Sequence, residues 1–203
     1  MLDDPFLSPR ESHGPRQPSF KVSTRQLGVI VLFVSLSVLF TGSIIAYLVT
    51  RMNSPVWRTA EMPGLPIGLL GSTLLLFGVS GAMHRAITSV RANRFDALSR
   101  ALWLTLFFAV AFLCGQALNW VEISRAQLAP GTKTLYAFTF YMLTGLHAVH
   151  VVGGFVPLGI VIGRARRREY SSSRHEGVKF CTQYWHFLGV VWLILLTTLY
   201  LAT

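Results

Sequence analysis

Four histidines lie in or beside long apolar stretches of the chain, where a polar side chain needs a partner or a task. His147 and His150 are three residues apart in one stretch, and His186 and His84 belong to two others. An i, i+3 spacing puts His147 and His150 on one face of a helix. They cannot therefore hold opposite faces of one haem. Either of them could still pair across a bundle with His186 or His84, as the axial ligands of a small b-type membrane cytochrome do.

The sequence lacks the residue patterns of other metal sites, disulfide frameworks and catalytic sites. No carboxylate or thiolate accompanies the two close histidines, and Cys114 and Cys181 have no CxxC or Cys/His spacing. A metal site or a disulfide framework is therefore not expected. The chain also lacks GxSxG, P-loop, HExxH and GxGxxG motifs, so we predict no catalytic, cofactor or metal residues. The imidazoles are expected to hydrogen-bond to neighbouring helices, water or lipid phosphate.

Composition indicates the environment that these residues occupy. The chain has 203 residues, of which 52% are hydrophobic and only 13% charged, with a net charge of +10 and a mean hydropathy of +0.52. Soluble domains carry roughly twice that share of charged residues, and disordered chains are far less apolar. A nucleic-acid binder would match the charge but not the hydropathy. The composition predicts an integral membrane protein.

Five stretches are long and apolar enough to cross a bilayer, which takes about 20 residues. They cover residues 27–50, 66–83, 101–121, 135–162 and 180–201. We predict an all-α five-helix transmembrane bundle over residues 27–203. Residues 1–26, rich in Pro, Ser and charge, are predicted to form a disordered cytoplasmic arm with no cleavable signal peptide.

The basic residues predict how the bundle is oriented. The arm, the second-to-third connection and the fourth-to-fifth connection together carry fourteen Lys and Arg, whereas the opposite side carries four. Because cytoplasmic loops are enriched in Lys and Arg, the N-terminus is predicted to be cytoplasmic and the C-terminus periplasmic. The expected location is a bacterial inner membrane, crossed several times.

The polar content of the predicted spans argues against a transporter. Gln116 and Asn119 lie in the third span, and Glu122 stands only at its end. The other four spans contain no Asp or Glu, and no internal repeat is visible. Since transporters usually have buried charges and repeated halves, this third interpretation is disfavoured.

Two motifs in the last two spans are specific. Residues 140–151 read FYMLTGLHAVHV, and residues 184–192 read YWHFLGVVW. They resemble the TGLHxxHV and YWHFxDxVW helices of subunit III of haem-copper respiratory oxidases. Gly115-Gln116 and the LLLF run at 74–77 fit the same family, and residues 40–51 resemble its short, five-helix bacterial form. The resemblance covers residues 25–203.

The resemblance implies an accessory subunit of cytochrome c oxidase. Subunit III of this family holds no haem or copper, which belong to partner chains. It packs against catalytic subunit I, with subunit II in the same complex, holds phospholipid and supports a proton-pumping respiratory oxidase. By resemblance, the lipid or inter-helix contacts would be His147, His150, Trp185, His186, Gln116 and Asn119. Subunit III of a quinol oxidase and the subunit III-like protein of nitric oxide reductase systems remain close alternatives.

Three membrane carboxylates of the family are missing from this chain. Leu36, Asn119 and Gly189 stand where the family usually has an acid. Because burying a carboxylate costs free energy, their replacement removes that cost together with any proton chemistry they supported. The resemblance thus predicts a divergent subunit III that keeps the bundle-forming and lipid-holding role.

Overall fold

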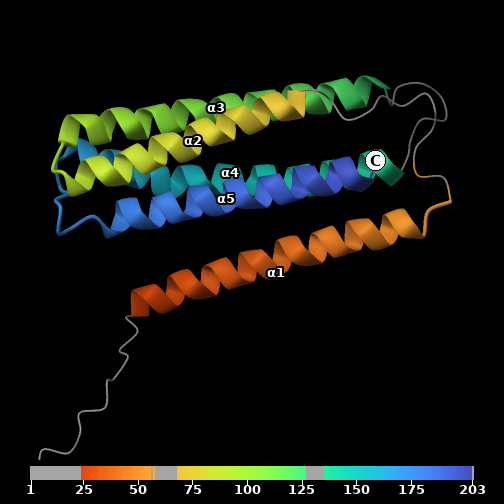
Figure 1. Ribbon diagram of the computed structural model, residues 1–203, viewed down its shortest axis with the longest axis horizontal. Coiled ribbons are helices and arrows are strands. Elements are labelled where there is room, and N and C mark those ends of the chain that lie inside the picture. Colours follow the sequence, from red (N-terminus) through yellow and green to blue (C-terminus); the bar gives the residue numbers. More distant parts are fainter. Residues whose placement is uncertain (1–23, 56, 58–67, 127–134, 203) are drawn as a thin grey trace, which may run out of the picture.

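The computed structural model describes residues 24–55, 57, 68–126 and 135–202. Throughout these ranges the regular structure is helical, and no strand is present in them. The five helices are α1 (Thr24–Met52), α2 (Gly68–Arg91), α3 (Phe95–Ala126), α4 (Leu135–Arg166) and α5 (Glu176–Ala202) (Figure 1). The all-α, five-helix prediction is confirmed. Most of the predicted N-terminal arm, residues 1–23, lies outside the described residues.

Four helices, α1, α3, α4 and α5, are long and apolar enough to cross a membrane. Helix α2 is not among them over its described length, and its second half contains His84 and Arg85. With 24 residues it is about 36 Å long, enough for a bilayer core of about 30 Å. It runs beside α3 along the bundle (Figure 1).

Helices α2 to α5 form a four-helix arrangement in which each contacts two neighbours. Helix α2 packs on α3 and α5, and α4 packs on the other side of the same two helices. The α2–α3 turn is tight: Asn93 has a left-handed φ of 52°, and the Arg94 amide donates to the Ser89 carbonyl. Such a C-terminal cap satisfies carbonyls that the helix end leaves open.

Helix α1 lies against α4 and α5 from outside the four-helix arrangement. It buries a narrow stripe, Leu36, Phe40 and Tyr47, whereas Ile30 and Val38 are exposed. In Figure 1 it approaches the bundle at its C-terminal end and diverges toward its N-terminal end. The C-terminal end of α1 is held by Trp57, whose ring makes edge contacts with Tyr47 and Tyr136 at centroid distances of 5.5 and 6.0 Å.

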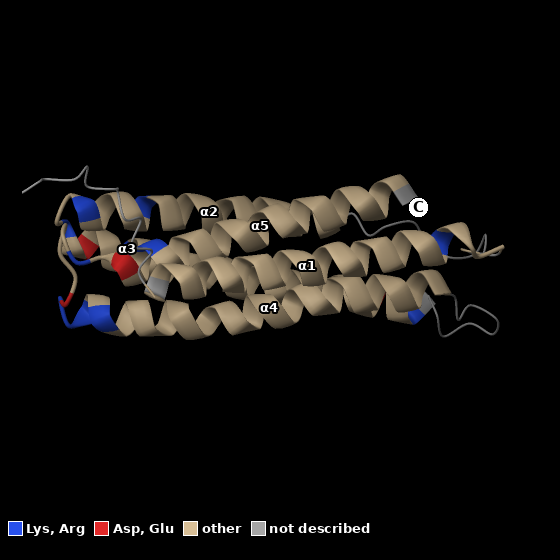
Figure 2. Cartoon of the chain, turned by 90° about the horizontal axis from the view of Figure 1, so that it is seen from below, with Lys and Arg blue, Asp and Glu red and all other residues tan. Residues whose placement is uncertain are grey.

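Charge is concentrated at one end of the bundle (Figure 2). The α2–α3 and α4–α5 turns and the helix ends beside them carry most of the described arginines, whereas Arg51 and Arg125 lie at the other end. The two basic turns are tied together by the Ser172 amide, which donates to Asn93 Oδ1 at 2.9 Å. The asymmetry that underlies the orientation prediction is thus present in three dimensions, while the cytoplasmic assignment of that end stays a prediction.

Candidate functional site

A layer of buried polar side chains crosses the bundle nearer its less basic end. Every helix from α2 to α4 contributes buried polar groups to it, namely Ser72, Thr73, Gln116, Asn119, Thr144 and His147. In an apolar environment each such group requires a hydrogen-bond partner, or costs roughly 1–3 kcal/mol. The partners of these groups therefore show what the layer does.

Three side-chain hydrogen bonds in this layer join different helices. Trp192 Nε1 of α5 donates to Thr73 Oγ1 of α2 at 3.0 Å. Trp120 Nε1 of α3 donates to Thr144 Oγ1 of α4, also at 3.0 Å. Asn119 Nδ2 lies 3.5 Å from Ser72 Oγ. Together these bonds link α2 with α5, α3 with α4 and α2 with α3.

Asn119 also explains why residue 68, at the start of α2, is glycine. The Asn119 amide occupies the space that a side chain at position 68 would need, so only glycine fits at Gly68. Asn119 is therefore a contact between α3 and α2.

His147 is fully buried and surrounded by aromatic rings. Its ring centroid is 5.2 Å from that of Trp192, 5.8 Å from Phe112 and 6.2 Å from Phe40. Neither ring nitrogen has a hydrogen-bond partner in the described part of the chain. The space beside this imidazole is thus filled by side chains, which leaves no room for a haem plane and disfavours the b-type cytochrome interpretation.

Gln116 of α3 lies at the same level along the bundle axis as His147 of α4. The Trp120–Thr144 bond sets the register of antiparallel α3 and α4. Gln116 is one turn before Trp120, and His147 is about one turn after Thr144, so the two lie at one level. Both amide heteroatoms of Gln116 are buried and unpartnered within the described residues, like the His147 ring. The core therefore contains two unsatisfied polar side chains at its centre.

The remaining predicted residues lie where α4 and α5 meet, and where α5 meets α2. His150 Nδ1 contacts the Leu146 carbonyl at 2.7 Å, and the Tyr184 hydroxyl donates to the His150 carbonyl at 2.9 Å. Trp185 is fully buried beside Gly154. His186 Nδ1 lies 3.1 Å from Ser80 Oγ of α2.

The three positions where the resemblance implies a missing carboxylate lie on three different helices. Leu36 belongs to the buried stripe of α1, and Asn119 contacts Ser72 on α2. Gly189 faces α2, where an added Cβ would meet Ser80 Oγ at 3.7 Å. Among the described residues, no group of three or more His, Cys, Asp or Glu is placed to hold a metal ion.

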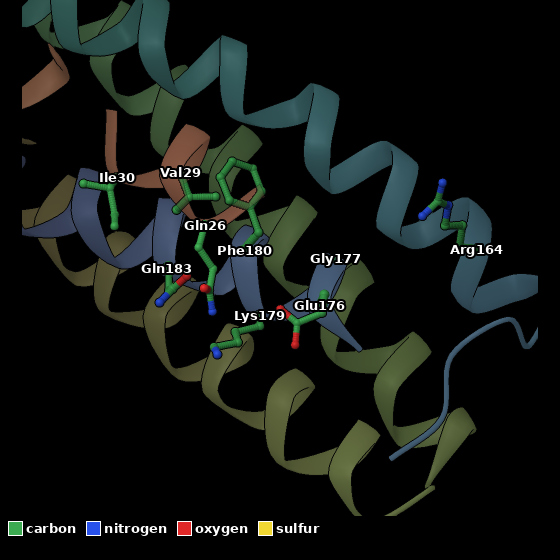
Figure 3. Close-up of a pocket in the computed structure, with 9 residues that line it drawn as sticks. All are labelled: Gln26, Val29, Ile30, Arg164, Glu176, Gly177, Lys179, Phe180 and Gln183. Atoms are coloured by element: carbon green, nitrogen blue, oxygen red, sulfur yellow. The ribbon is translucent and has the colours of Figure 1, made fainter. Parts of the chain in front are cut away.

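The structure reveals a cavity that the sequence did not indicate. It has a volume of about 740 Å³ and lies at the basic end, between the start of α1, the start of α5 and Arg164 of α4 (Figure 3). Val29, Ile30 and Phe180 give it apolar walls, whereas Arg164, Glu176 and Lys179 give it charged groups. The sequence feature that accompanies this cavity is the basic charge at the same end of the bundle.

Tyr170, in the α4–α5 turn, packs at the edge of this region. Its hydroxyl lies 2.8 Å from where a Cβ on Gly177 would stand, so the cavity wall requires glycine there. Burial raises the pKa of Tyr170 above its ordinary value, and the nearby Arg164 guanidinium partly counteracts that rise. The hydroxyl therefore stays neutral at physiological pH.

Comparison with known proteins agrees with this architecture. The family described as cytochrome c oxidase subunit III matches residues 13–203. Cytochrome c oxidase subunit 3 of Synechocystis sp. is 32% identical over 96% of this chain and 81% of its own length. The protein of the same name from Thermostichus vulcanus is 32% identical over 94% of this chain and 92% of its length. That from Ovis aries is 30% identical over 94% and 75%, respectively.

These matches span almost the whole described bundle, including the two motifs in α4 and α5. They do not favour a quinol oxidase subunit, a nitric oxide reductase protein or a small cytochrome. A multi-pass helical membrane protein with this breadth of similarity belongs to the cytochrome c oxidase subunit III family and is a subunit of a haem-copper oxidase.

Proposed function

We propose that the chain is an accessory, non-catalytic subunit that stabilises the catalytic subunit and holds phospholipid. The partners would be subunit I, which with subunit II would carry the haem and copper. The complex would lie in a bacterial inner membrane, as the cyanobacterial relatives suggest.

The observation that carries this proposal is how the polar groups of the bundle are used. The indole N–H groups of half-buried Trp120 and buried Trp192 donate hydrogen bonds between helices, and His186 of α5 contacts Ser80 of α2. Every helix also presents large apolar side chains outward, such as Val38, Leu74, Phe107, Val149 and Ile194. A rigid bundle with apolar outer faces suits a scaffold that packs against another membrane subunit.

The cavity at the basic end is the proposed lipid site. Its apolar walls suit acyl chains, and Arg164 and Lys179 suit a phosphate headgroup at the same end. Glu176 would favour a headgroup that also carries a positive charge. Helix α1 diverges from the bundle at this end (Figure 1).

Co-purification tests the accessory role. The tagged full-length chain should bring subunits I and II with it from mild detergent. Trp185→Ala combined with His186→Ala should loosen the α4–α5 and α2–α5 contacts, so the oxidase should lose this chain or inactivate faster during turnover. Its initial rate should change little. An immediate and complete loss of turnover in an intact complex would contradict the proposal, as would recovery of the chain without partners.

Lipid analysis tests the cavity. Arg164→Gln with Lys179→Gln should lower the phospholipid retained per complex. Arg91→Gln with Arg100→Gln removes the same charge from the same end but outside the cavity, and should retain wild-type lipid. Equal retention in all variants would show that the two cavity cations do not hold a headgroup.

A further inference from the structure

A second, smaller pocket lies between α2 and α5, away from the basic end. Its volume is about 270 Å³. Phe77 and Val190 line it and are more than half exposed, so it opens toward the bilayer. Trp192 forms part of its wall, and Ser80 and His186 supply its polar groups.

The pocket lies near the middle of the membrane. Ser80 is 12 residues from the start of α2 and 11 from its end, which is roughly 16–18 Å either way. His186 is 10 residues from the start of α5. Phospholipid headgroups lie at the edges of a hydrocarbon core about 30 Å thick, so none reaches this depth.

The lining specifies a neutral ligand. No Asp, Glu, Lys or Arg is among the described residues that line the pocket, so an ionised headgroup would enter it at a large desolvation cost. His186 and Ser80, 3.1 Å apart, form a hydrogen-bonding pair beside the opening. The indole N–H of Trp192 already donates a hydrogen bond to Thr73. The polar contact for a ligand is therefore the pair formed by the His186 imidazole and the Ser80 hydroxyl.

The lining side chains restrict the class of ligand further. Phe77 is the aromatic lining residue with an exposed ring, whereas Trp192 is fully buried behind the pocket against Phe112 and His147. An added Cβ at Gly189 would have Ser80 Oγ, at 3.7 Å, as its nearest neighbour, so the pocket has free space at this glycine. An acyl chain would fill the space but use neither His186 nor Ser80. A flat neutral ring with carbonyl acceptors would pack against Phe77 and accept a hydrogen bond from the pair.

We propose that the α2–α5 pocket binds the ring of an isoprenoid quinone, with the tail extending into the bilayer between Phe77 and Val190. A volume of 270 Å³ is at the small end for ligand pockets and suits a ring rather than a whole lipid. The proposal concerns binding alone and does not depend on the accessory role.

Photolabelling of the intact complex tests this site. The probe is an azido-benzoquinone with a decyl tail, and labelled peptides are located by mass spectrometry. Wild type should show saturable label on α2 or α5, displaced by decylubiquinone but not by a phospholipid with decanoyl chains. Gly189→Leu fills the pocket, and His186→Phe removes the hydrogen bond. Each should weaken labelling about tenfold, equivalent to about 1.4 kcal/mol.

Matched variants make the outcome decisive. Gly159→Leu adds the same side chain at an exposed glycine of α4 with nothing within 4 Å, and should label like wild type. If Gly189→Leu does not assemble, Gly189→Ala, which fits by the 3.7 Å distance, should weaken labelling less. Labelling lost with Gly189→Leu but kept with His186→Phe would reveal an acyl-chain site and overturn the proposal. Labelling that no variant changes, or that falls outside α2 and α5, would also overturn it.

Discussion

Helices α4 and α5 pack tightly at Gly154, and adding one methyl group there should separate the two helices. A Cβ at this position would be 2.9 Å from Tyr184 Cε1 and 3.2 Å from Trp185 Cζ2. The Tyr184 ring cannot simply turn away, because its hydroxyl donates to the His150 carbonyl at 2.9 Å. Trp185 is fully buried and cannot move outward either.

The size of the effect follows from two opposing terms. Replacing glycine by alanine inside a helix stabilises it by about 1 kcal/mol. Overpacking a core that cannot relax costs about 1–3 kcal/mol. Gly159→Ala on the same helix has the first term without the second, because nothing lies within 4 Å of its Cβ. Gly154→Ala should therefore be less stable than Gly159→Ala by about 1–3 kcal/mol.

Thermal unfolding in detergent measures this difference. A thiol-reactive fluorogenic dye reports unfolding through Cys181, which is buried, once exposed Cys114 is replaced by serine. At about 2–4 °C per kcal/mol, Gly154→Ala should melt roughly 2–12 °C below Gly159→Ala. Equal melting temperatures, or a higher one for Gly154→Ala, would refute the tight α4–α5 contact on which this reasoning depends.

The same melting assay tests two further features, with effects of opposite sign. Gln116→Met removes a buried amide whose two heteroatoms lack partners in the described structure, so the melting temperature should stay equal or rise; a clear fall would mean that the amide has a partner such as buried water. Trp57→Ala removes the ring packed on Tyr47 and Tyr136 and should destabilise by about 3–5 kcal/mol, whereas Trp57→Phe should lose less. Indistinguishable Ala and Phe variants would show that the ring does not hold α1.

Hydrophobicity alone was sufficient to predict the fold class, because a helix in lipid must satisfy its backbone internally and leaves a long apolar run in the sequence. The apolar stretches do not show where the helices end. Helix α2 continues to Arg91, beyond the predicted span that ends near residue 83, and α3 begins at Phe95, before the predicted span that starts at 101. Helical turns continue beyond the apolar run into the basic region, where charged side chains reach water and the backbone remains hydrogen-bonded.

Residue types in the sequence also identified which polar groups needed partners, since a polar side chain without a partner costs free energy at membrane depth. They could not identify the partners, because these lie far apart in the chain. His186 meets Ser80 across 106 positions, and Trp192 meets Thr73 across 119. Both cavities depend on the angle at which one helix leaves another, and that angle is set by packing of side chains from several helices at once. The sequence therefore determined a membrane bundle of this family, and only the tertiary structure decided where a ligand fits.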